Sequence, residues 1–158
     1  MHPKNIGRLA LPLFTLALAS CAQPTSPQSV AATGDYVSAD YNQRDAGYDW
    51  LAVSLSSTQQ GQLLVSVRAR NDRKQPSCTF DGYAQQTGPQ TYALSAQGQT
   101  ITLTVTPTQL SIKANHAKGD SALAYYCSGG ATLAGTYHKL AAPLDRHQLD
   151  PRPFTPGA

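Results

Sequence analysis

The fold is decided by the stretch Thr100-Ile101-Thr102-Leu103-Thr104-Val105-Thr106-Pro107-Thr108-Gln109-Leu110-Ser111-Ile112-Lys113-Ala114, in which apolar and polar residues alternate in two runs. Successive side chains of a β-strand point to opposite faces, so this alternation predicts two strands with one apolar and one solvated face. The two runs are separated only by a turn at Pro107-Thr108. So short a connection predicts that the strands pair antiparallel, as a hairpin.

The same alternation extends outward in both directions along the chain. It is clear over residues 51–56 and 63–70, and weaker strand signals follow turn residues elsewhere. The weaker candidate strands cover residues 36–41, 77–84, 91–95, 123–127 and 131–140. The sequence thus predicts a meander of eight or nine short strands.

The composition also favours strands, because Glu is absent while Thr, Ser, Gln, Val and Tyr are plentiful. No segment offers a long run at helical period. A meander of this size must protect its edge strands, and closing into a small barrel does so directly. We expect an all-β domain over residues 34–142, folded as a closed antiparallel barrel, with a two-sheet β-sandwich as the alternative.

The N-terminus has the features of an export signal. Lys4 and Arg8 precede an apolar run over residues 9–19, which is too short to cross a bilayer as a helix. The run ends in Leu18-Ala19-Ser20-Cys21, which resembles the lipobox of bacterial lipoproteins. The resemblance implies cleavage before Cys21 and acyl chains on that cysteine, which would anchor the mature chain to a membrane.

The lipoprotein resemblance sets further expectations for the rest of the chain. Residues 1–20 are a signal peptide, residues 21–33 a flexible tether and residues 143–158 a proline-rich tail. Ala22 favours the outer membrane, with the domain in the periplasm and surface display as an alternative. Losing Lys4 and Arg8 leaves 10 of the 12 basic residues against 9 acidic ones, which gives no signature of a nucleic-acid partner.

Cys78 and Cys127 are the two thiols that remain once Cys21 carries lipid. In an oxidising periplasm an even number of cysteines favours a disulfide, and neither lies in a Cys-x-x-Cys redox motif. We expect one structural disulfide between them. The chain-entropy model assigns a ring of this length about 4 kcal/mol of stabilisation.

The sequence offers little that is typical of a catalytic site. No pair of histidines has the spacing of metal ligands, and Ser128 is not in the Gly-x-Ser-x-Gly context of hydrolases. We therefore expect no metal, no cofactor and no enzymatic activity.

Two sets of residues are candidates for partner binding. The first is a basic cluster at one strand end, in which Arg68 and Arg70 face outward and run into Arg73 and Lys74. Such a cluster can bind carboxylates or phosphates through paired hydrogen bonds. The alternative is a solvated strand edge that charge protects from aggregation.

The second set is the loop Ser128-Gly129-Gly130 with the nearby His138 and Lys139. In size, anchor, strand content, cysteine number and this glycine-rich loop, the chain resembles the small β-barrel lipoproteins that inhibit lysozyme. These insert a Ser-Gly-rich loop into the enzyme's cleft beside a second loop that carries a lysine. The longer Ser-Gly-Ser-Gly-Ala-Lys-Tyr signature of that class is absent, so the resemblance is one of architecture.

These observations predict a lipid-anchored periplasmic binding protein. Its most concrete version is an inhibitor of a peptidoglycan-lytic enzyme of the lysozyme or muramidase type, or an immunity protein against one. The alternatives are a lipoprotein that binds a small ligand or an anionic envelope polymer, and a structural lipoprotein of a secretion or envelope complex.

Overall fold

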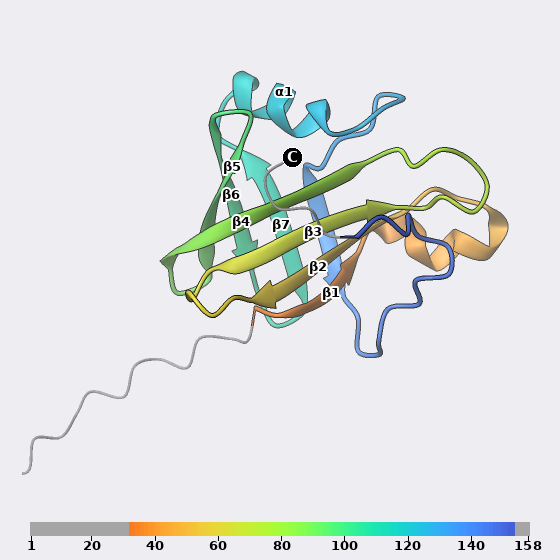
Figure 1. The fold of residues 1–158 in the computed structure, drawn as a ribbon, viewed down its shortest axis with the longest axis horizontal. Helices are drawn as coiled ribbons and strands as arrows, with labels where there is room; N and C mark the ends of the chain where they lie inside the picture. Colours follow the sequence, from red (N-terminus) through yellow and green to blue (C-terminus); the bar gives the residue numbers. More distant parts are fainter. Residues whose placement is uncertain (1–31, 154–158) are drawn as a thin grey trace, which may run out of the picture.

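The computed structural model describes residues 32–153, which form eight strands and two short helices (Figure 1). The strands, in chain order, are β1 (Gly34–Val37), β2 (Leu51–Ser57), β3 (Leu63–Ala69), β4 (Thr79–Gly88), β5 (Thr91–Ala96), β6 (Gln99–Val105), β7 (Gln109–Ala114) and β8 (Gly135–Lys139). The helices are a 3₁₀ helix, η1 (Ala39–Ala46), and an α-helix, α1 (Ala117–Tyr125).

Each strand pairs antiparallel with the next, and β8 returns to pair with β1, which closes the barrel. The disulfide Cys78–Cys127 joins the residue before β4 to the segment after α1. The prediction of a closed antiparallel barrel with one disulfide is confirmed, and the strand number is eight. The hairpin turn Gln97-Gly98 has positive φ at both residues, 48° and 69°, which is typical of the type I′ turns that join antiparallel strands.

The alternating apolar residues point into the barrel and fill it. Side chains from all eight strands form one buried cluster, as expected for a barrel whose interior is just wide enough for them. Its strand members with at most 5% exposure are Tyr36, Val53, Leu55, Leu63, Val65, Val67, Ala69, Phe80, Ala84, Leu94, Ala96, Ile101, Leu103, Val105, Leu110, Ile112 and Tyr137.

The expected strand over residues 123–127 is wrong, because most of that segment belongs to α1. His116 caps the helix, its Nδ1 accepting a hydrogen bond from the backbone N–H of Gly119 at 3.2 Å. The buried positions 119, 122 and 123 lie at helical spacing, and the helix packs over the ends of β5, β6 and β7 (Figure 1). A Cβ on Gly119 would lie 2.7 Å from the Cβ of Ala114, so glycine permits this close approach.

The first strand is also shorter than expected, since β1 ends at Val37 and Tyr41 lies in η1. There the Tyr41 ring meets the edge of Trp50, with 4.7 Å between ring centroids. Gly47 caps the C-terminal end of η1 in the left-handed conformation, with a φ of 94°. This aromatic contact holds η1 against the start of β2.

The proline-rich segment 143–153 has no helix or strand, yet it packs on the outside of the barrel. Leu144 and Leu149 are 8% and 5% exposed and join Trp50 in a second apolar cluster, completed by Val37 and Ala52. The predicted end of the β domain at residue 142 is therefore too early. Its predicted start at residue 34 is also too late, because Ala32 is buried and its carbonyl accepts a hydrogen bond from Tyr36 at 2.9 Å.

The two ends of the barrel differ. The end near α1 carries the disulfide and the loop after the helix, whereas β1 begins at the other end. Gly34 lies there beside Lys139, whose backbone N–H donates to the carbonyl of Thr108 in the β6–β7 turn at 2.8 Å. Within residues 32–153, neither helix combines the length and apolar character that a membrane span requires. The signal peptide, Cys21 and most of the expected tether lie outside the described residues.

Candidate functional site

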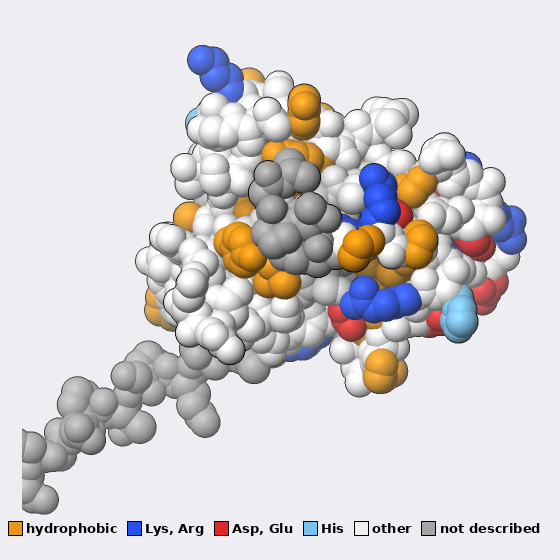
Figure 2. Space-filling view, in the orientation of Figure 1, with side chains coloured by type: hydrophobic (Ala, Val, Ile, Leu, Met, Phe, Trp, Pro, Cys, Tyr) orange, Lys and Arg blue, Asp and Glu red, His pale blue; other side chains and the backbone are white. Residues whose placement is uncertain are grey.

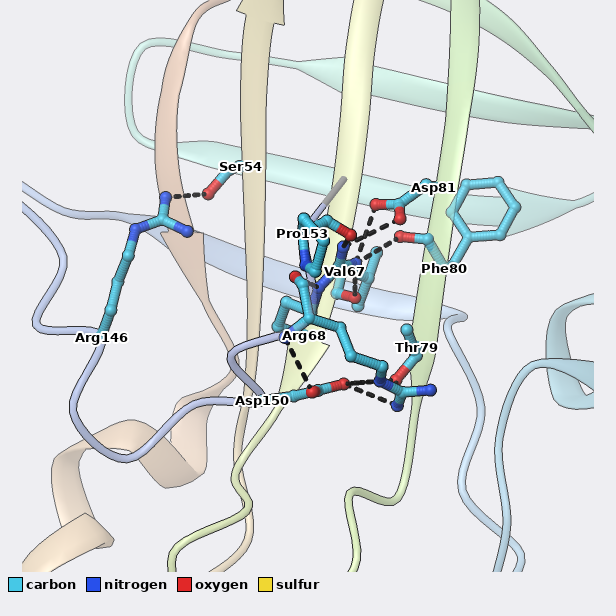
Figure 3. Close-up of polar contacts among 10 residues, drawn as sticks. Ser54, Val67, Arg68, Thr79, Phe80, Asp81, Arg146, Asp150 and Pro153 are labelled. Atoms are coloured by element: carbon cyan, nitrogen blue, oxygen red, sulfur yellow. Dashed lines mark hydrogen bonds and ion pairs between the residues drawn. The ribbon is translucent and has the colours of Figure 1, made fainter. Parts of the chain in front are cut away.

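Arg68 lies on the outer face of β3, as predicted, but only 4% of it is exposed. Its Nη1 and Nη2 donate to the two carboxylate oxygens of Asp81 on β4, each at 2.8 Å (Figure 3). At 2.8–3.2 Å it also donates to four backbone carbonyls, those of Val67, Phe80, Arg152 and Pro153. All three guanidinium nitrogens are thus engaged within the protein, and Arg68 acts as a clamp between the barrel and the C-terminal segment.

Arg70 is buried in the same way at the end of β3, with 2% exposure. Its Nε and Nη2 donate to Asp72 at 2.5 and 2.9 Å, and its Nη1 donates to the backbone carbonyls of Tyr48 and Arg44. The hydrogen bond between the two side chains raises the pKa of Arg70 and lowers that of Asp72. Arg70 therefore ties η1 and the segment that follows it to the end of β3.

The basic cluster expected from the sequence does not form an exposed patch. Of its four residues only Arg73 and Lys74 are exposed, and Lys74 Nζ lies 2.5 Å from Asp49 Oδ2. The interpretation of Arg68 and Arg70 as solvent-facing binding residues is wrong. Alternation correctly predicts that they leave the barrel interior, but it carries no information on the segments that cover them.

Asp150 holds the C-terminal segment in place. Its carboxylate accepts hydrogen bonds from the Thr79 hydroxyl at 3.0 Å, from Arg152 Nε at 2.6 Å and from the Arg152 backbone N–H at 3.1 Å (Figure 3). Burial by itself would raise the pKa of Asp150, but the hydrogen bonds from Arg152 and Thr79 outweigh burial and lower it. Asp150 is therefore ionised at neutral pH, and its charge is paired.

A pocket of about 460 Å³ lies between this segment and the outer faces of β2 and β3. At its rim the exposed Arg146 donates to the Ser54 hydroxyl at 3.1 Å and lies 3.6 Å from Asp35. The pocket lining includes Arg68, Arg146 and Arg152, and each of them is paired with an aspartate. Figure 2 shows basic side chains of this face with acidic side chains beside them. The pocket therefore presents no concentrated positive charge.

The loop Ser128-Gly129-Gly130 projects beyond α1 and all three residues are exposed (Figure 1). Gly129 and Gly130 have φ values of 63° and 81°, in the left-handed region that favours glycine. A Cβ added to either glycine would meet no heavy atom of residues 32–153 within 4 Å. The loop thus presents nearly bare backbone to its surroundings.

Both ends of this loop are held firmly. On one side Cys127 is bonded to Cys78, and the Ser128 backbone N–H donates to the carbonyl of Ser77 at 2.7 Å. On the other side Leu133 is buried, and its carbonyl accepts a hydrogen bond from the Tyr137 hydroxyl at 2.8 Å. Burial raises the pKa of Tyr137, so this hydroxyl remains a donor well above neutral pH.

A pocket of about 280 Å³ lies beside the loop, between the segment 131–137 and the start of β2. Its polar lining is rich in hydroxyls and holds two carboxylates, from Ser38, Asp40, Asp49, Ser77, Thr132 and Thr136. The sequence did not single out this set as a site. Asp49 is recognisable there only as part of a turn, and the segments that meet at the pocket lie about 80 residues apart along the chain.

His138 and Lys139 do not lie beside the loop. Lys139 is near the opposite end of the barrel, where its Nζ stands 5.6 Å from the centre of the Tyr36 ring. His138 is exposed on β8, opposite Val37 and Gln109. The structure therefore separates two groups of residues that the sequence placed in one candidate interface.

Comparisons with protein-family models, curated proteins and solved structures find no match to the chain. Among residues 32–153, no three His, Cys or Asp side chains are grouped so that they could hold a metal ion. The candidate site is thus defined by geometry alone. It is the loop end of the barrel, which consists of the loop Ser128-Gly129-Gly130 and the acidic pocket beside it.

Proposed function

We propose that this chain is a lipid-anchored, non-enzymatic binding protein of the bacterial envelope. Its partner is a peptidoglycan-lytic enzyme of the lysozyme or muramidase type, which it inhibits by placing the loop Ser128-Gly129-Gly130 in the substrate cleft. The observation that carries the proposal is this loop, whose backbone is bare at the tip and held at both ends. Such a loop can enter a narrow cleft and loses little conformational freedom when it binds.

The orientation of the barrel supports the same function. The chain enters the barrel at Gly34, at the end away from the loop. A lipid on Cys21, which the lipobox predicts, would therefore connect the domain to the membrane from the end opposite the loop. Asp40 beside the loop would complement a basic group on a partner, which increases the rate of association and favours one orientation, whereas Asp49 is already paired with Lys74.

The proposal involves Ser128, Gly129 and Gly130 but not Lys139, which lies at the other end of the barrel. The alternative of an anionic envelope polymer loses its main support, because Arg68 and Arg70 are buried and paired.

The test is to titrate the full-length chain in detergent into a set of muramidases and to measure inhibition and complex formation. Replacing Gly130 by Gln adds a side chain at the tip, and we expect at least about a tenfold loss of affinity, or about 1.4 kcal/mol. Gly61→Gln is the matched control, because Gly61 also has a positive φ, of 75°, and open space around it, in the β2–β3 turn at the opposite end. Equal inhibition by the two variants, or no complex with any enzyme at about 10 μM, would contradict the proposal.

A further inference from the structure

A second pocket near α1, of about 320 Å³, combines aromatic rings with hydrogen-bonding groups. It lies where the end of α1 meets the start of β4, and Arg152 of the C-terminal segment reaches its rim. Its lining includes Thr79, Asp81, Gln97, Tyr125, Tyr126 and Arg152. The volume is at the lower end of the range of small-molecule sites, which starts at about 300 Å³.

Of the two tyrosine rings in the aromatic wall of the pocket, one is packed against the protein and the other is exposed to solvent. Tyr126 packs edge-on against Phe80, with 4.7 Å between ring centroids, and its hydroxyl accepts a hydrogen bond from Gln97 Nε2 at 3.3 Å. Tyr125 stands against Tyr126 at 5.3 Å and is 69% exposed. The pocket thus has one ring built into the protein and one ring available to a ligand.

The polar wall carries charges that cancel. Asp81 is paired with Arg68 through two hydrogen bonds of 2.8 Å, and Arg152 is paired with Asp150 at 2.6 Å. The two arginines and the two aspartates therefore contribute no net charge. The pocket can offer hydroxyl, amide, guanidinium and carboxylate groups for hydrogen bonding without attracting an ion of either sign.

An exposed aromatic ring beside uncharged or charge-compensated polar groups suits one class of ligand. The C–H face of a pyranose ring is apolar and packs on an aromatic face, while the hydroxyls around its edge both donate and accept hydrogen bonds. We propose that this pocket binds a neutral sugar ring, with Tyr125 as the stacking platform and Gln97, Thr79 and Arg152 at the hydroxyls. A peptide or an anionic ligand fits less well, because the wall has no unbalanced charge.

This inference does not depend on the proposed function. The pocket near α1 and the loop end share no lining residue. Either proposal can therefore be wrong without affecting the other. The nearness of both to α1 suggests that a chain tethered near Gly34 could hold a glycan and a protein partner at the same end of the barrel.

The experiment is a titration of the full-length, isotope-labelled chain, in a detergent without sugar groups, with chitotriose and separately with cellotriose. We expect saturable shifts of the Gln97 side-chain amide signal and millimolar affinity for at least one of the two sugars. Tyr125→Ala should weaken binding at least tenfold, whereas Tyr125→Phe should retain it. Tyr48→Ala is the matched control, since Tyr48 is 52% exposed and lies outside the pocket.

Salt dependence separates a neutral from an anionic ligand site. Raising the NaCl concentration from about 0.05 to about 0.5 M should leave the affinity for a neutral sugar unchanged, because no net charge is neutralised. Three results would overturn the inference: no saturable binding of either trisaccharide, equal losses in the Tyr125→Ala and Tyr48→Ala variants, or binding that disappears at high salt.

Discussion

The barrel interior and the layer outside β1–β3 are both buried, but they are buried by different means. The interior is filled by aliphatic and aromatic side chains that alternate along the strands. The outer layer has a small apolar cluster around Trp50. Beside it the buried arginines Arg68 and Arg70 are each paired with an aspartate, and they hold the covering segments by donating hydrogen bonds to backbone carbonyls of those segments. Burial therefore has two origins here: strand alternation inside, and covering segments outside.

The difference has an energetic consequence. Interior side chains are stabilised by removal of apolar surface from water, at about 25 cal/mol per Å². A buried ion pair gains little net stability over an apolar pair. Removal of one partner, however, leaves the other charge buried without a partner, which is strongly destabilising. Substitutions that change side-chain volume should therefore lower the stability of the interior most. Substitutions that remove one partner of an ion pair should lower the stability of the outer layer most.

The largest effect is expected from Arg68→Ala. This change leaves the carboxylate of Asp81, whose side chain is 8% exposed, without its main partner, and we expect a loss of about 3–5 kcal/mol in the free energy of unfolding. Chemical denaturation measures it. The double variant Arg68→Met with Asp81→Leu removes both charges and should recover most of the loss. A loss below about 1 kcal/mol, the usual value of an exposed pair, would show that the site is solvated.

A smaller effect is expected from Leu149→Ala in the C-terminal segment. Leu149 is 5% exposed in the outer cluster, and we expect a loss of about 2 kcal/mol, at the lower end of the range for buried leucines. Leu103→Ala, at a fully buried interior position, is the reference and should cost about 3 kcal/mol or more. If Leu149→Ala leaves the denaturation midpoint unchanged, the packing of residues 143–153 on the barrel contributes nothing to the stability of the domain.

The smallest effect is the pH dependence that Asp150 contributes. Its pKa in the folded protein lies below the unfolded value of 3.8, so its stabilising contribution is fully present above that value. The contribution disappears as the pH falls through the folded pKa. Unfolding curves between pH 6 and pH 2 should show a shallower decline in stability for Asp150→Asn than for the original chain. Parallel curves would show that Asp150 does not contribute.

The interior was predictable because the relevant information is local. Alternation along each strand indicates which side chains face inward, and turn residues such as Gln97-Gly98 mark where the chain reverses. The segment around Leu123 was not predictable in this way, because a short run with two tyrosines fits a strand as well as a helix. The helix forms there because His116 caps it and Leu123 reaches the barrel core.

The candidate sites also include one feature that the sequence shows and others that only the tertiary structure shows. The glycine pair at residues 129–130 is visible in the sequence, since adjacent glycines predict an exposed turn. The acidic pocket beside it and the pocket near α1, for which we propose sugar binding, both combine residues from segments far apart along the chain. The contact between Arg68 and Arg152 joins residues 84 positions apart, and no local pattern indicates it.

The sequence by itself determined an antiparallel all-β domain and predicted one disulfide, because strand alternation, turn residues and the number of cysteines are properties of neighbouring residues or of composition. It left both a closed barrel and a β-sandwich open. Only the tertiary structure decided that Arg68 and Arg70 are buried, that residues 143–153 belong to the domain, and that Lys139 lies far from the Gly129-Gly130 loop. Alternation determines the face of a strand on which a side chain lies. What covers that face depends on contacts between segments distant in the chain, and these form only when the whole domain folds.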